Sequence, residues 1–261
     1  MCEEKIAIIG AGAMGGAIAE GILKSGVVPA ANLVVTNRSK EKLERFASRG
    51  AKVTTNNREA VESADIVVLA VKPWLVESVL GEFSDILSDE KTLISVAAGV
   101  DSTSLRTWAG DECSLFMAIP NIAIAQLASM TFLTPVDVID EKTQVVKNIF
   151  DEMGKTYVCE EQQLSVGMAL ASCGIAYAFR YIRAAMEGGV ELGFRAAQSQ
   201  EIVMQTLKGA VALLESEGLH PEQAIDQVTT PGGFTIRGLN AMEQAGFTSS
   251  VIQGLRASVH Q

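Results

Sequence analysis

The stretch from Lys5 to Gly15, KIAIIGAGAMG, joins a short apolar run to a glycine-rich turn, and the amphipathic segment AIAEGILKSG follows it. The turn fits G-x-G-x-x-G, in which glycines let the backbone bend tightly and approach a pyrophosphate at the amides of a helix N-terminus. Because a strand pattern precedes the turn and a helix pattern follows it, we interpret it as a dinucleotide-binding turn. A tight glycine turn without a ligand is the alternative.

The end of the second apolar run indicates which dinucleotide binds. LVVT is followed by Asn37, Arg38 and Ser39, where an NAD enzyme usually carries Asp or Glu to bond the ribose 2′-hydroxyl. Arg38 can pair with a 2′-phosphate, and its two neighbours can donate hydrogen bonds to it. NADP is therefore the preferred cofactor. Arg38 could instead be a solvated loop residue and Ser39 the N-cap of the next helix, and both descriptions can hold together.

Two further runs end in small residues. Ala70-Val71-Lys72-Pro73 follows one of them, and Ser95-Val96-Ala97-Ala98-Gly99 follows the next. Ligands of open α/β sheets lie at the carboxyl ends of the strands, so small residues there leave room for ribose and nicotinamide. Pro73 can also simply start a helix, and we assign Lys72 no chemical role.

The two parts of the chain have different patterns. Up to about residue 160, apolar runs alternate with segments of helical period, which predicts βα units around a parallel sheet. The runs are Ile6–Ile9, Leu33–Val35, Ile66–Ala70, Leu93–Val96 and Leu115–Ala118, and helical periods cover Ser39–Arg49 and Val76–Leu87. Beyond Glu160 only helical patterns remain. We therefore predict an α/β Rossmann-type dinucleotide-binding domain over residues 1–160 and an all-α domain over residues 161–261.

A long helix is predicted from about Gln162 to Gly193, apolar on most of its circumference through Phe179. Its apolar run Val166–Phe179 has 14 residues before Arg180, fewer than the roughly 20 that span a bilayer, so we expect a buried helix and no membrane span. A helix on the surface of a small domain would not be apolar all round, so we expect it to pack against a second subunit as well. The central helix of a monomeric bundle is the alternative.

Composition excludes several functional classes. The formal charge of −10 over 261 residues disfavours nucleic acid as a partner, although a few amides and one Arg can still hold a phosphate. No basic segment with a cleavage site stands at the beginning, so we expect no export. The cysteines lack C-x-x-C spacing, which predicts reduced thiols in a cytoplasmic protein and no zinc or disulfide framework; they are Cys2, Cys113, Cys159 and Cys173. With His220 and His260 as the only histidines, most hydrolase triads and His-based metal sites are excluded.

The stretch VTTPGGFTIRG, from Val228 to Gly238, places Pro and two Gly between helical patterns. We interpret Thr230 as an N-cap, Pro231 as the first helical residue and Gly232 with Gly233 as the next positions. Pro at the first position loses no helical hydrogen bond, and glycines would leave the free amides open to a carboxylate. An ordinary turn between helices is the alternative.

Taken with these motifs, the chain resembles the pyrroline-5-carboxylate reductase family from about Lys5 to Ser258. The motifs are IGAGAMGGAI, NRS, AVKP, SVAAGV, QTLKGA and above all DQVTTPGGFTIRGL at Asp226–Leu239. The resemblance implies a Rossmann domain followed by a helical domain that interlocks with its mate in a dimer. It also implies NAD(P)H-dependent reduction of 1-pyrroline-5-carboxylate to L-proline, a small imino-acid substrate.

Residue roles are carried over from the family onto matching positions. Thr235 would donate a hydrogen bond to the pyrroline nitrogen, while Thr230, Gly232, Gly233 and Asn121 would contact the substrate. The implied cofactor contacts are Gly10, Ala11, Gly12, Ala13, Met14, Asn37, Arg38, Ser39, Asn56, Ala70, Val71, Lys72, Pro73, Ala97, Ala98 and, near the nicotinamide, Gln227. Such a reduction needs hydride at carbon and a proton at nitrogen. It therefore suits a chain with few histidines, because a Thr hydroxyl can orient the imine without titrating.

Two motifs depart from the family. Where it commonly has M-P-N-T-P, this chain has IPNIA at Ile119–Ala123, and where it has S-G-S-G-P-A-Y, this chain has ASCGIAY at Ala171–Tyr177. An imine or keto-acid reductase with another substrate, or a silent dinucleotide-binding paralogue, therefore remains open. Cys173 is expected to be a buried thiol, Tyr177 a core residue, and Glu217 with Glu222 part of a capped, solvated loop rather than of an active site.

Overall fold

The computed structural model describes residues 3–259, so Cys2 and His260 lie outside the described residues. The chain divides into two compact units after Ser172. We describe each unit by itself. The predicted boundary near residue 160 was inferred from the loss of strand patterns. The division in the structure falls 12 residues later, inside a continuous helix. The domain limits of 1–160 and 161–261 stay a prediction.

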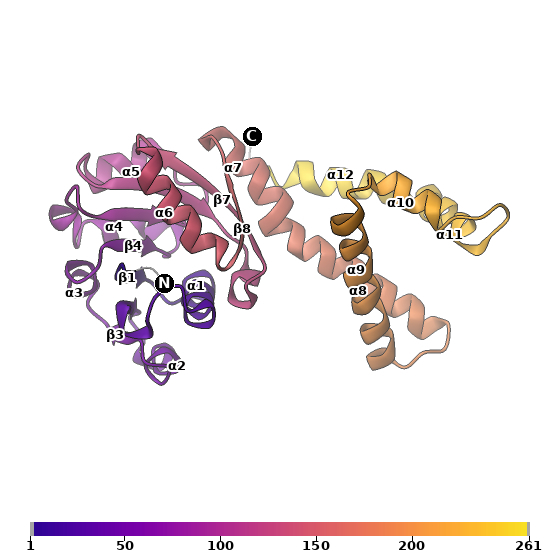
Figure 1. Cartoon of the computed structure of the whole chain (residues 1–261), viewed down its shortest axis with the longest axis horizontal. Coiled ribbons are helices and arrows are strands. Elements are labelled where there is room, and N and C mark those ends of the chain that lie inside the picture. Colours follow the sequence, from indigo (N-terminus) through magenta and orange to yellow (C-terminus); the bar gives the residue numbers. More distant parts are fainter. Residues whose placement is uncertain (1–2, 260–261) are drawn as a thin grey trace. The chain divides into compact units, whose positions relative to one another are not determined.

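The first unit is built on an eight-stranded sheet with helices on both faces (Figure 1). Its strands are β1 (Ile6–Ile9), β2 (Leu33–Thr36), β3 (Lys52–Thr54), β4 (Ile66–Leu69), β5 (Thr92–Ser95), β6 (Ser114–Ile119), β7 (Ser129–Val136) and β8 (Gly154–Val158). Its longer helices are α1 (Ala13–Ser25), α3 (Asn57–Glu62), α5 (Ser102–Ala109), α6 (Asp140–Asp151) and α7 (Glu161–Gly167). Shorter turns of helix are η1 (Ala30–Asn32), η2 (Lys40–Lys42), α2 (Glu44–Ala47), η3 (Pro73–Leu75), α4 (Val76–Leu80), η4 (Ser84–Ile86) and η5 (Ile122–Gln126).

The strand order is β3-β2-β1-β4-β5-β6-β7-β8, and every neighbouring pair is parallel except β6 with β7. The order reverses beside β1, so β2 and β4 flank it and their carboxyl ends meet the glycine turn. Alternate residues of β1 serve two cores, because Ile6 and Ile8 pack on one face while Ala7 and Ile9 pack on the other. Helices on both sides explain why the central strands read as continuous apolar runs.

The structure confirms the five predicted strands within one residue at each end and adds β3, β7 and β8. Two expected helices are shorter than predicted: Ser39–Arg49 contains only η2 and α2, and Val76–Leu87 contains α4 and η4. No strand follows Val158 among residues 3–259, which confirms the change of pattern after residue 160.

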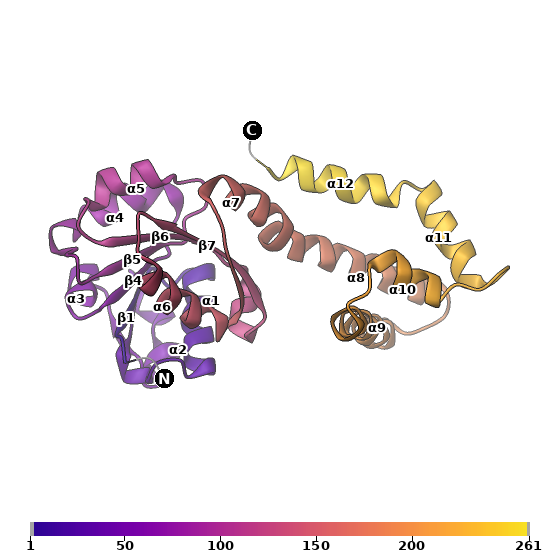
Figure 2. The same ribbon diagram turned by 45° about the horizontal axis from the view of Figure 1, so that its top comes forward.

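The second unit is helical (Figure 2). Its elements are α8 (Gly174–Glu191), α9 (Ala196–Glu217), α10 (Pro221–Gln227), α11 (Phe234–Gln244) and α12 (Phe247–Ala257). A π-helical segment, η6 (Met168–Cys173), joins α7 to α8, so that Glu161–Glu191 forms one continuous helix. The helices α8 and α9 pack side by side, where a Cβ on Gly189 would lie 2.6 Å from Ser199 Oγ.

The expectation of a buried helix at Val166–Phe179 is wrong for the single chain. Val166, Leu170 and Phe179 are each about half exposed, and α8 to α12 contain no buried apolar side chain. By length and composition alone, Glu161–Glu191 is also long and apolar enough to cross a membrane, and only 11% of its most apolar part is buried. An apolar surface of this extent requires cover by a partner or a bilayer.

We predict that Asp101 stabilises the fold in a pH-dependent way. Its carboxylate caps α5 by accepting from Ser104 N at 2.7 Å, and this bond lowers the carboxyl pKa below its ordinary 3.8. A lowered pKa contributes stability above the ordinary value, and that contribution is lost as pH falls through the lowered one. Asp101→Ala should therefore lower the urea midpoint at pH 7, with the difference from wild type shrinking below about pH 4. An equal difference at pH 7 and pH 3 would contradict the prediction.

Candidate functional site

The glycine turn is tied to the strands on both sides of β1. Gly10 and Ala11 donate their backbone N–H groups to Thr36 O at 3.2 and 2.8 Å, and Ala70 N donates to Ile9 O at 2.9 Å. Thr36 is the last residue of β2, and Ala70 directly follows β4. The turn, the β2 end and the β4 end therefore form one continuous surface at the carboxyl edge of the sheet.

The space around the glycines fits a pyrophosphate. Gly10 has a φ of 100°, and a Cβ on Gly15 would lie 2.0 Å from Gly10 O, so α1 starts directly against the turn. Gly12 is exposed, and a Cβ there would meet nothing within 4 Å. No side chain caps α1, which leaves its first amides facing this open space. Ala13 and Met14 occupy the first two helical positions.

The end of β2 holds the predicted phosphate-selecting residues. Arg38 is exposed, and Asn37 Oδ1 accepts from Ser39 N at 2.9 Å, which orders the turn between them. Ser39 occupies the N-cap position of η2, but its side chain makes no capping bond. The expected helix cap is therefore absent.

Asn56 and the residue after it have different partners. Asn56 Oδ1 caps α3 by accepting from Glu59 N at 3.3 Å. Asn57, which the sequence interpretation missed, accepts from Thr36 Oγ1 at 2.7 Å and donates to Glu82 Oε2 at 2.8 Å. Thr36 Oγ1 also accepts from Gly10 N at 3.3 Å, so Asn57 is linked to the glycine turn. The N-N doublet alone could not reveal which Asn faces the sheet.

The ends of β4, β5 and β6 continue this edge. Lys72 and Trp74 are exposed beside Pro73, with Lys72 Nζ 6.0 Å from the centre of the Trp74 ring. After β5, Ala97 is buried and Ala98 is exposed. Pro73 begins η3, which agrees with the alternative that this residue simply starts a helix. Asn121 follows β6 and is 8% exposed.

The Pro-Gly-Gly segment differs from its predicted form. Gly232 has a φ of 70°, Gly233 N donates to Thr230 O at 2.9 Å, and α11 begins at Phe234 with Gly233 as its N-cap. Pro followed by Gly at positive φ is typical of a type II turn. The prediction of Thr230 as N-cap and Gly232 and Gly233 as helical residues is therefore wrong, because a positive φ is incompatible with a helix.

The polar groups of this segment nevertheless lie close together in sequence and face solvent. Thr230 and Thr235 are exposed, Thr235 stands in the first turn of α11, and no side chain caps that helix. The free first-turn amides belong to residues 234 to 236 rather than to the glycines. Gln227 is exposed at the end of α10, on the other side of the turn.

The cysteines and Tyr177, which the sequence analysis expected to be structural rather than catalytic, differ in their burial. Burial raises the pKa of the Cys113 and Cys159 thiols, which keeps them protonated, whereas Cys173 is half-buried rather than buried. Tyr177 is also half-buried, and its hydroxyl donates to Gly254 O at 3.2 Å.

His220 caps α10 by accepting from Glu222 N at 3.3 Å, which agrees with a capped, exposed loop at Glu217 and Glu222. Within residues 3–259, no three His, Cys, Asp or Glu side chains gather where they could hold a metal ion.

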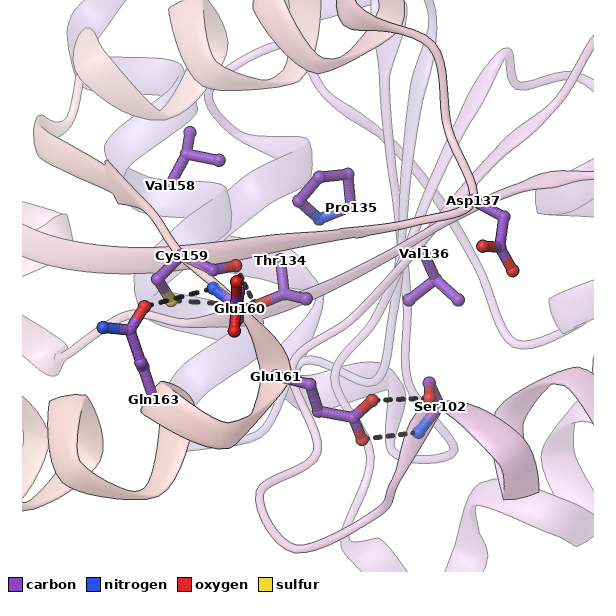
Figure 3. Close-up of a pocket in the computed structure, with 10 residues that line it drawn as sticks. All are labelled: Ser102, Thr134, Pro135, Val136, Asp137, Val158, Cys159, Glu160, Glu161 and Gln163. Atoms are coloured by element: carbon purple, nitrogen blue, oxygen red, sulfur yellow. Dashed lines mark hydrogen bonds between the residues drawn. The ribbon is translucent and has the colours of Figure 1, made fainter.

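The first unit also contains a separate cavity of about 640 Å³ between the ends of β7 and β8 and the starts of α5 and α7. Figure 3 shows Glu161 there, with its carboxylate accepting from Ser102 N at 2.9 Å and Ser102 Oγ at 2.5 Å. Thr134 Oγ1 donates to Cys159 O at 2.9 Å. None of the predicted cofactor or substrate residues lines this cavity, so its size alone does not make it the active site.

Comparison with known families assigns both parts of the chain. A family described as NADP oxidoreductase coenzyme F420-dependent matches residues 5–99, which contain the glycine turn. A family described as Pyrroline-5-carboxylate reductase dimerisation matches residues 161–261, which contain the exposed apolar helices. A dimerisation role explains why these helices are apolar and poorly covered in one chain.

Similar proteins extend over nearly the whole chain. Pyrroline-5-carboxylate reductase 1 of Dictyostelium discoideum is 37% identical over 98% of this chain, which spans about half (49%) of that longer relative. Pyrroline-5-carboxylate reductase 2 of the same organism is 33% identical over 99% of this chain and 92% of the relative. The crystal structure of Plasmodium falciparum pyrroline carboxylate reductase with NADP bound has a TM-score of 0.90 and 27% identity, covering 98% of this chain and 95% of that one.

Two glycine substitutions should separate binding from folding at the turn. Gly12→Ala places its methyl group in open space, so we expect unchanged thermal stability but NADPH affinity reduced about tenfold or more through loss of charge-assisted bonds. Gly15→Ala forces α1 away from Gly10 O, so we expect stability to fall by about 1–3 kcal/mol as well. Fluorescence titration and thermal unfolding measure the two effects. Full NADPH affinity in Gly12→Ala would show that the pyrophosphate does not bind beside Gly12.

Proposed function

Because the chain belongs to the pyrroline-5-carboxylate reductase family and is an NAD(P)H-dependent oxidoreductase acting on a C=N bond, we propose how its residues serve reduction of 1-pyrroline-5-carboxylate to L-proline. The observation that carries the assignment is a match over nearly the full length of both this chain and a reductase that is 33% identical. The substrate-side motif DQVTTPGGFTIRGL agrees with it.

The first unit binds the dinucleotide along the carboxyl edge of its sheet. The amides at the start of α1 hold the pyrophosphate, and Gly10 and Gly12 let the backbone approach it. Small residues at Ala70 and Ala97–Ala98 leave room for the ribose and nicotinamide. The bound cofactor supplies a hydride from C4 of its reduced nicotinamide ring.

NADPH is the preferred form of the cofactor. Arg38 is exposed at the end of β2, makes no ion pair with a carboxylate among residues 3–259, and stands where an acidic residue would select NADH. The turn ordered by the Asn37–Ser39 hydrogen bond would bring backbone N–H groups and the Ser39 hydroxyl close to the 2′-phosphate of NADPH.

The start of α11 receives the substrate. Its uncapped amides and positive dipole end favour the substrate carboxylate, and the turn at Gly232–Gly233 removes side chains from the approach. The Thr235 hydroxyl can donate to a neutral imine nitrogen or accept from a protonated one. Neither role needs Thr235 to titrate, which agrees with a site that lacks a predicted catalytic His.

The helices of residues 161–261 dimerise, as the family match indicates. We infer that the partner is a second copy of this chain. The apolar side chains exposed on α8 are the surface that such a partner covers. A cytoplasmic location is part of this proposal, supported by scattered cysteines that suit reduced thiols. The domain limits of 1–160 and 161–261 are part of the same proposal.

Thr235→Ala should lower the catalytic step more than it lowers cofactor binding. Loss of one hydrogen bond to a polar or charged nitrogen predicts a fall of about tenfold to a hundredfold in kcat/KM for 1-pyrroline-5-carboxylate. The NADPH Kd should stay within about twofold, and Thr235→Ser, which keeps the hydroxyl, should retain most activity. Steady-state assays of NADPH oxidation with titration of NADPH test this. An equal loss of NADPH affinity would show that Thr235 is misplaced.

Arg38→Asp should move cofactor preference toward NADH. The new carboxylate repels a 2′-phosphate and can accept a hydrogen bond from a 2′-hydroxyl, so the kcat/KM ratio of NADPH to NADH should fall by at least about tenfold. Arg49→Asp makes the same charge change at another exposed position and serves as the control. If both variants shift the ratio equally, general charge rather than the β2 end sets the preference.

A further inference from the structure

Two hydrogen bonds join the segment after β6 to the π-helical segment η6. Ser172 Oγ donates to Pro120 O at 2.9 Å, and Asn121 Nδ2 donates to Ala171 O at 3.4 Å. All four residues belong to the first unit. π-helical segments are rare and often occur at functional sites.

The polar atoms of Asn121 each make a hydrogen bond within the protein. Its backbone N donates to Ser129 Oγ at 3.2 Å, and its Oδ1 accepts from Ala123 N at 3.0 Å. Its remaining side-chain atom, Nδ2, is the donor to Ala171 O. Because Asn121 is buried and bonded in this way, its side chain supports the loop, and the substrate contact implied by the sequence stays a separate prediction.

These bonds depend on the residue types at positions 172 and 123. Ser172 donates through a hydroxyl, which Gly lacks, and Ala123 donates through a backbone N–H, which Pro lacks. Both bonds reach the same short segment, at Pro120 and Asn121. The stretches IPNIA and ASCGIAY therefore meet at one place in the structure.

The loop that receives these bonds is also fixed to the phosphate-binding helix. A Cβ on Gly21 of α1 would lie 2.6 Å from Ile124 O of η5, and Lys24 Nζ donates to Gln126 Oε1 at 2.8 Å. On its other side, β6 pairs with β5, whose end leads into Ala97 and Ala98. The segment Pro120–Gln126 thus lies between the proposed cofactor surface and η6.

We propose that Ser172 and Asn121 are positioning residues for the imine reduction, which hold Pro120 and the start of η5 against η6 at the edge of the cofactor site. This rests on the proposed function for the reaction itself. It assigns neither residue a contact with substrate or cofactor. Their effect is to fix the loop beside the nicotinamide end of the sheet.

Ser172→Ala tests the proposal, with Ser172→Thr as the rescue that keeps the hydroxyl. Ser165→Ala is the matched control, because Ser165 lies earlier in the same continuous helix with similar partial burial. We expect Ser172→Ala to lower kcat/KM for 1-pyrroline-5-carboxylate about threefold to tenfold, the usual size of one hydrogen bond. The NADPH Kd should stay within twofold, and both other variants should resemble wild type. Unchanged kcat/KM in Ser172→Ala overturns the proposal.

A double variant tests whether the two altered motifs act together. Ala123→Pro removes the donor to Asn121 Oδ1 at an early position of η5, where Pro is tolerated. If both bonds hold one loop, Ser172→Ala and Ala123→Pro together should lower kcat/KM by clearly less than the product of the single effects. Independent, multiplicative losses would overturn the shared role.

Hydrogen exchange separates failure of this inference from failure of the proposed function. If wild type does not oxidise NADPH with 1-pyrroline-5-carboxylate, the proposed function fails. The amides of residues 119–126 still report the linkage, and we expect them to exchange about threefold to tenfold faster in Ser172→Ala than in wild type or Ser165→Ala. Equal exchange in all three proteins overturns the positioning role without any assay of activity.

Discussion

The absence of a side chain at Gly15 is the constraint on which the first unit depends. A Cβ there would lie 2.0 Å from Gly10 O and 2.8 Å from Ala70 Cβ, so only glycine lets α1 begin directly against the ends of β1 and β4. That contact aims the first amides of α1 along the carboxyl edge of the sheet. The turn is then held by Thr36, whose carbonyl and hydroxyl oxygens both accept from Gly10 N. Dinucleotide binding thus follows from backbone packing before any charged side chain contributes.

The second unit follows a different principle, because it lacks a core of its own. Among its described residues the only buried side chain is that of Ser199, while Phe179, Val211 and Phe234 are all more than half exposed. Burial of apolar area is the main favourable term in folding, so helices this exposed depend on a partner for much of their stability. The dimerisation match over residues 161–261 supplies that partner. Length and hydropathy alone could not distinguish this arrangement from a membrane span.

Much of the fold could be predicted from sequence because the central strands are buried on both faces. Their apolar runs stand out, as at Ile6–Ile9 and Ile66–Leu69. The edge strand β3 gave no such signal, since two of its three residues are exposed, and β7 contains a Pro and alternates in burial. The Rossmann turn and the helical second part could be predicted for a different reason, because their sequence patterns are local.

Candidate site residues were predictable as motifs, but not in their conformations. The Pro-Gly-Gly segment was interpreted as helical because Pro favours the first helical position, yet the same residues also favour a type II turn, and the positive φ of Gly232 shows which one forms. Asn57 was missed because its partner Thr36 lies 21 positions away in sequence. Contacts of this kind depend on sheet order, which a single sequence does not contain.

The departures from the family motifs show why altered motifs have to be considered in pairs. Taken singly, the stretches IPNIA and ASCGIAY look like losses and weaken the case for activity. In the structure Ser172 donates to Pro120 O and Ala123 N donates to Asn121 Oδ1, so both stretches supply bonds to the same loop. That loop also packs against α1, where Lys24 Nζ donates to Gln126 Oε1. The altered motifs therefore agree with the proposed reductase, in which bonds from both of them support this loop.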